Sequence, residues 1–190
     1  ATQSSYLHHI EPVWKALPAE MRGTFHVGSR QVMKDAQRRC LDVELGGCRM
    51  PGPATIIAGY HDLHECHPGR PLIYLSHGVD QTYQDHPSHP AYAGGKQRGR
   101  VGLFLVPHEA SAAKERAAYP DALVEVIGCP RLDPFPAELR SLHDPLVVAF
   151  AWHWDAPIVP ESRWSFPEWR HSMVALTQSG EYQVIGTGHP

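Results

Sequence analysis

VGLFLVPHEASAAKERAAYPDALVEVIGCP, residues 101–130, predicts a strand at 101–106, a helix at 111–118 and a second strand at 122–127. Both strands are continuous apolar runs, which is typical of strands that are buried on both faces of a sheet. A strand, a helix and a strand in succession favour a parallel pair with a crossover helix. This stretch therefore predicts an α/β fold that is built on a parallel sheet.

The same alternation extends over the rest of the chain. Further strands are expected at 23–27, 54–58, 71–76, 146–152 and 182–185, and further helices at 11–17, 29–41 and 165–178. A proline-rich stretch at 133–144 marks a boundary, and the strand, helix and strand after it cannot cover their own faces. We predict a first domain at 1–137, a linker at 138–144 and an incomplete βαβ unit at 145–190.

Composition excludes several classes of protein. The chain has 190 residues, with 42% apolar and 19% charged side chains, so it is not a disordered chain. It has 17 Lys and Arg against 20 Asp and Glu, so a basic nucleic-acid footprint is not expected. No apolar run is long enough to cross a membrane, and residues 1–12 lack the basic and apolar regions of a signal peptide. We expect no membrane insertion.

The four cysteines form no CxxC pair. Cys40 lies in a helical pattern and Cys129 in an apolar strand-like run. We interpret Cys40, Cys48, Cys66 and Cys129 as buried free thiols, the usual state of isolated cysteines in a core. Free thiols favour a reducing, cytoplasmic compartment.

Histidines follow four of the expected strands, and the chain has 14 of them. His77, His108, His153 and His189 each lie just beyond a strand, at the sheet edge where α/β proteins bind ligands. We therefore predict a shared functional cleft, and the alternative is a set of solvated loop histidines. Imidazole titrates near neutral pH, so His77 is our candidate for the general base, unless it only bonds a neighbouring carbonyl.

Three neighbouring segments supply further candidates. Gly78 would let the backbone approach a substrate closely. His86 and His89 lie in a long loop that could contact a substrate or be a plain surface loop. Gly186, Thr187, Gly188 and His189 could offer N–H groups to an anion, although their spacing matches no known phosphate fingerprint.

His61, His64, Cys66 and His67 form an H-x-x-H-x-C-H pattern, which could bind zinc. No second ligand pair completes a recognised site, so a polar loop is the better interpretation. We predict no metal and keep a zinc-dependent hydrolase as the weakest alternative.

Three short motifs resemble those of two-domain (GT-B) glycosyltransferases. They are Ser76-His77-Gly78, Val106-Pro107-His108-Glu109 and Val126-Ile127-Gly128-Cys129-Pro130-Arg131-Leu132-Asp133. The nearest similarity is to CDP-glycerol glycerophosphotransferases and UDP-sugar epimerases, and His189-Pro190 is similar to the pair that touches donor phosphate in the former.

The resemblance implies a Rossmann-like acceptor-side domain followed by the start of a nucleotide-binding domain. It implies transfer of a sugar or polyol phosphate from a nucleotide-activated donor to a hydroxyl acceptor, with no cofactor. His77 would be catalytic, and Gly78, His86, His89, His108 and Glu109 would bind the acceptor. His153, Gly186, Thr187, Gly188 and His189 would bind the donor phosphate. The alternative is a non-catalytic binding module on the same scaffold, and an unfinished second unit would favour self-association.

Overall fold

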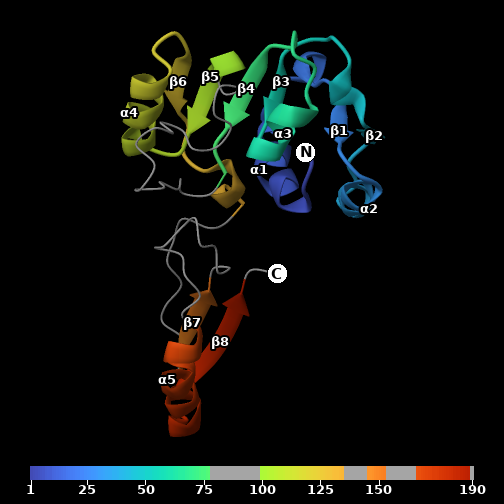
Figure 1. Cartoon of the computed structure of the whole chain (residues 1–190). Coiled ribbons are helices and arrows are strands. Elements are labelled where there is room, and N and C mark those ends of the chain that lie inside the picture. The colour runs from blue at the N-terminus through green and yellow to red at the C-terminus, as the bar shows by residue number, and fades with distance from the viewer. Residues whose placement is uncertain (78–98, 135–144, 153–165, 189–190) are drawn as a thin grey trace. The chain divides into compact units, whose positions relative to one another are not determined.

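The computed structural model describes residues 1–77, 99–134, 145–152 and 166–188, and the contacts between Cα atoms divide the chain into two units, Ala1–Phe135 and Pro136–Pro190. The first unit contains a four-stranded, all-parallel sheet in the order β3-β4-β5-β6 (Figure 1). A parallel two-stranded sheet, β1-β2, belongs to the same unit. The strands are β1 (Phe25–Val27), β2 (Val43–Leu45), β3 (Thr55–Ile57), β4 (Leu72–Leu75), β5 (Val101–Val106) and β6 (Leu123–Val126).

Helices flank these strands, so the predicted Rossmann-like α/β architecture is confirmed. The helices are α1 (Ser4–Ala16), α2 (Arg30–Arg38), α3 (Tyr60–Glu65) and α4 (Glu109–Ala118). Short 3-10 turns are η1 (Ala19–Met21), η2 (Gly47–Arg49) and η4 (Pro130–Leu132). The second unit is one βαβ element, with β7 (Leu146–Trp152) parallel to β8 (Tyr182–Gly188) and α5 (Phe166–Ser179) between them.

The core of the first unit lies on both faces of the sheet. Successive strand residues point to opposite faces, and in β4 Leu75 packs with α1 and α2 whereas Tyr74 packs with Phe104 and the residues around α4. Phe104 is wholly buried in the second of these clusters. The continuous apolar strands of the sequence are thus explained by two covered faces.

Three elements differ from their prediction. Helix α1 begins at Ser4 rather than at residue 11, and Pro12 lies inside it. A proline in a helix interior removes a hydrogen bond, and burial of Tyr6, Leu7 and Ile10 compensates for that loss. Neither β2 nor α3 was predicted, because three and six residues are too few to show a period.

Among the residues that the structure describes, no helix is both long and apolar enough to span a lipid bilayer.

Candidate functional site

His77 lies two residues beyond the end of β4 and is exposed. Its imidazole ring faces two aromatic side chains of α1: the ring centroids of His77 and Tyr6 are 5.2 Å apart, and those of His77 and His9 are 6.0 Å apart. This edge is where strands of a parallel sheet present their carboxyl ends. The predicted general base is therefore at the expected edge, next to two residues that are distant in the sequence.

Helix α1 supplies these neighbours through its buried face. Tyr6, His9 and Ile10 recur at the spacing of one helical face, and His9 is only 4% exposed. Burial, together with the nearby His77, Arg131 and His8, lowers the pKa of His9 to about 4. His9 is consequently neutral at pH 7.

Tyr6 packs against Gly59, which leaves space for its ring. A Cβ atom on Gly59 would lie 2.0 Å from Cζ of Tyr6, so only glycine leaves room for the ring. Burial, together with the charge of Asp62, raises the pKa of Tyr6 to about 12. The tyrosine is a neutral phenol that packs the base of the site rather than a group that ionises near pH 7.

Ionic contacts surround this aromatic cluster. Glu11 accepts a hydrogen bond of 2.6 Å from Arg39 Nε and pairs with Lys15 Nζ at 2.7 Å. Burial favours a higher pKa for Glu11, but hydrogen bonds from Lys15 and Arg39 hold its pKa below the ordinary value. Arg39 Nη1 also lies 3.2 Å from His8 Nδ1. We define the His77 cluster as His77, Tyr6, His8, His9, Arg39 and Arg131.

Arg131 joins the cluster because η4 packs against α1. Burial is the largest cause that lowers the pKa of His8 and of His9, and the charge of Arg131 lowers both in addition. Arg131 is itself exposed. The exposed guanidinium of Arg131 gives this cluster a positive charge, which favours an anion.

His108 and Glu109 have structural contacts instead. His108 is the N-cap of α4, and its Nδ1 accepts the N–H of Ser111 at 3.2 Å. Glu109 pairs with Arg116 at 3.0 Å on the surface of the same helix. Their predicted contact with an acceptor stays a prediction, and the cap gives the observed reason for a histidine at 108.

The other predicted residues lie in the second unit or outside the described residues. Gly186, Thr187 and Gly188 lie in β8, paired with Phe150, Ala151 and Trp152, so the glycine-rich loop expected there is strand. Gly78, His86, His89, His153 and His189 lie outside the described residues.

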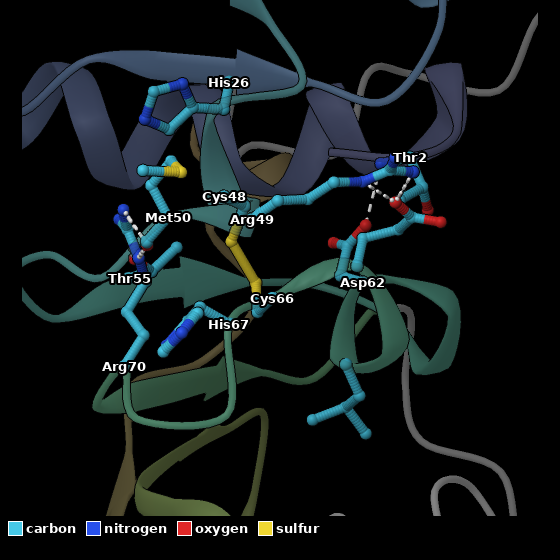
Figure 2. The surroundings of a disulfide bond; sticks show 12 residues. Thr2, His26, Cys48, Arg49, Met50, Thr55, Asp62, Cys66, His67 and Arg70 are labelled. Atoms are coloured by element: carbon cyan, nitrogen blue, oxygen red, sulfur yellow. Dashed lines mark hydrogen bonds and ion pairs between the residues drawn. A yellow bond between two sulfur atoms is a disulfide. The ribbon is translucent and has the colours of Figure 1, made fainter.

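The prediction of four buried free thiols was wrong for Cys48 and Cys66; Cys40 and Cys129 are free, as predicted, but Cys129 is only half-buried. Cys48 and Cys66 form a disulfide, with Cα atoms 4.8 Å apart (Figure 2). Beside the disulfide, the N–H of His67 donates to the Cys48 carbonyl at 2.9 Å and links η2 to the segment just after α3. Cys40 is also not buried: it is exposed, with a φ of 58° just beyond α2. Because two of the four cysteines form a disulfide, the cysteines give no support for a cytoplasmic compartment.

The same disulfide weakens the zinc alternative, because Cys66 is no longer a thiolate. His67 Nδ1 accepts the N–H of Gly69 at 3.1 Å. Among the residues that the structure describes, no three His, Cys, Asp or Glu side chains gather to hold a metal ion.

Sequence reasoning missed His9, Tyr6, Arg39 and the role of Arg131. The adjacent pair His8-His9 was visible, but its significance depends on which of the two faces the sheet. Comparison of the chain with protein-family models, curated protein sequences and solved structures gives no match. Function must therefore be argued from the His77 cluster itself.

Proposed function

We propose that the chain is part of a transferase that passes a sugar or polyol phosphate from a nucleotide-activated donor to a hydroxyl acceptor. His77 is the general base that takes the proton of the acceptor hydroxyl as its oxygen bonds to the transferred group, while the bond from that group to the nucleotide breaks and the nucleotide leaves with its phosphate. The observation that carries the proposal is the exposed imidazole of His77 at the carboxyl edge of the sheet, seated against Tyr6 and His9.

The neutral neighbours of His77 suit this role. A proton on His77 and a proton on His9 disfavour each other, since the two imidazoles lie close together. At pH 7 His9 is neutral, so it packs against His77 without adding a charge to the site. This leaves His77 as the proposed proton acceptor of the pair.

Positive charge beside the base supports an anionic reactant. The exposed guanidinium of Arg131 lies close enough to His9 to lower its pKa. Sugar nucleotides and polyol phosphates carry phosphate charge, which such a surface attracts. The donor half of the site, for which His153 and 186–189 are the candidates, remains a prediction.

The test is transfer of label from CDP-glycerol and UDP-sugars to hydroxyl acceptors by the 190-residue protein. His77→Ala and His77→Gln should lower the rate by about 10²–10⁴, the usual contribution of a general base. The rate of the unchanged protein should fall as acid protonates the base. His171→Ala is the matched control, since His171 is an exposed histidine on α5, and it should stay within about twofold.

Two results would contradict the proposal. If the His77→Ala protein turns over substrate at nearly the normal rate, His77 is not the general base. Absence of transfer and of donor hydrolysis with every donor favours the non-catalytic binding module.

A further inference from the structure

A cavity of about 500 Å³ lies between β1 and β3. It is bounded by Ile10 and Trp14 of α1, by Phe25 and His26 of β1, and by Ile56 of β3. Both neighbouring sheets are parallel, yet in the part of the chain that the structure describes β1 and β3 belong to different sheets. We call this space the β1–β3 slot.

The peptide groups on both sides of the slot point into it. Along a strand the N–H and C=O groups of successive residues point to opposite edges. The Val27 carbonyl accepts the N–H of Gly46 on the β2 side, so the N–H and C=O of the preceding residue, His26, point to the slot. The N–H of Thr55 donates to the Pro71 carbonyl on the β4 side, so the N–H and C=O of the next residue, Ile56, point to the slot from β3. Each sheet thus offers the slot a strand edge that can pair.

Ala1 already occupies one end of the slot as a strand would. Its nitrogen donates to the His26 carbonyl at 2.7 Å, and its carbonyl accepts the N–H of Gly28 at 2.9 Å. These two bonds, from one residue to the two residues that flank Val27, are the repeating unit of a parallel ladder. The chain therefore enters α1 from a position beside β1 and in parallel with it.

Asp62 links this position to β3. Its carboxylate accepts the N–H of Thr2 at 2.7 Å through Oδ1 (Figure 2). It also accepts the N–H of Ala58 at 3.1 Å through Oδ2. Asp62 is 3% exposed, so the pairing is made inside the protein. The carboxylate thus bonds both the segment that lies beside β1 and the residue that follows β3.

We propose that the β1–β3 slot receives one further parallel strand, formed by residues joined to the nitrogen of Ala1. This strand would pair with His26 on one edge and with Ile56 on the other, and it would unite the two sheets of the first unit. β1 and β3 have three residues each, about 10 Å of strand, so the slot suits an insert of three to five residues.

The chemistry of the insert follows from the lining. One face of the strand would pack on Ile10 and Trp14, and the other would face the Cys48–Cys66 disulfide. A strand covered on both faces is an apolar run rich in β-branched residues. The strand would continue directly into α1, which bears Tyr6 and His9, so its pairing would also fix the helix that forms the His77 cluster.

The test is to join five β-branched residues, preceded by one lysine, to Ala1 and to follow amide hydrogen exchange at His26 and Ile56. Both amides should exchange at least about tenfold more slowly than in the 190-residue chain, because both become ladder donors. The matched control carries an extension of equal length with proline at every second position. Proline lacks the N–H that the ladder needs along one edge and has a fixed φ of about −65°, so this extension should not pair as a strand and both amides should exchange as in the unextended chain.

Unchanged exchange at both amides in the first extended chain would overturn the proposal, and would leave the cavity as a small-molecule space. Should that chain aggregate, the same strand is added as a free peptide to the 190-residue protein. Saturable protection of His26 and Ile56 supports the slot, and no protection at millimolar peptide overturns it. Activity is not used in this test, so its failure is distinct from failure of the transferase proposal.

Discussion

His9 shows how one buried side chain couples the candidate site to stability. Its imidazole is held neutral by burial and by neighbouring positive charge, and its pKa is lowered to about 4. Its neighbour in the sequence, His8, is exposed and bonds to Arg39. Two adjacent histidines thus have different environments because the phase of α1 turns only one of them toward the core.

This difference predicts a pH dependence of folding. Unfolded His9 has an ordinary pKa near 6.5, so between pH 6.5 and about 4 the unfolded chain binds a proton that the folded chain does not. Stability is fully present above pH 6.5 and falls as the pH drops through this window, by about 2 kcal/mol between pH 7 and 5.

Urea unfolding at pH 7, 6 and 5 measures this loss, since ordinary carboxyl groups stay ionised there. His9→Gln should flatten the slope. It should not abolish it, because burial also lowers the pKa of His8 and of His26. An equal slope in both proteins would show that His9 is not the titrating group.

At the scale of elements, short turns and caps fix the parts that the hydrophobic pattern leaves open. Disulfide Cys48–Cys66 ties η2 to the end of α3 across a sequence separation of 18. Arg70, which is buried, donates to the Met50 carbonyl at 3.0 Å and to Thr55 Oγ1 at 2.9 Å in the same region (Figure 2). These contacts shape one wall of the β1–β3 slot.

Removal of the disulfide should destabilise the first unit. Cys48→Ser with Cys66→Ser is expected to lower the free energy of unfolding by about 3 kcal/mol, because the unfolded chain regains the entropy of an open loop. The same loss should follow addition of a reductant, measured by urea unfolding. Cys40→Ser is the control, and it should change the free energy of unfolding little. If the unchanged protein has equal stability with and without reductant, the Cys48–Cys66 disulfide is contradicted.

His108 provides a second test at this scale. His108→Ala should cost about 1 kcal/mol, since the Ser111 N–H loses its cap, whereas His108→Asn should retain stability because asparagine is a good N-cap. Thermal unfolding of the two variants measures this. In the transfer assay, loss of activity in both variants would instead support the predicted contact with the acceptor.

At the scale of the whole molecule, the two units differ in how well they bury their apolar residues. The first unit has two buried clusters, on opposite faces of its sheet. In the second unit Trp169, Val174 and Ile185 are 51%, 47% and 47% exposed. One βαβ element has too few neighbours to cover both faces of its strands.

Self-association through this unit is therefore expected. The mass measured by light scattering should rise with protein concentration, and Ile185→Lys should reduce the rise by placing a charge on the apolar surface. Gln178→Lys is the control, because Gln178 is an exposed polar residue on α5. A mass equal to one chain at all concentrations would contradict the prediction.

The sequence by itself determined the α/β class, the strands β1 and β3 to β8, and the place of His77 at a strand end. Long apolar runs and strand ends are local features of the sequence, so they can be predicted without knowledge of the tertiary structure. Tertiary structure decided which residues surround His77, because Tyr6 and His9 come from a helix about 70 residues away in the chain.

Tertiary structure also decided the Cys48–Cys66 pair, the role of His108 as a cap and the gap between β1 and β3. Each of these depends on the distance between segments that pack, and no periodicity in the sequence encodes that distance. Short elements such as β2 and α3 belong to the same group, since packing rather than local pattern stabilises them.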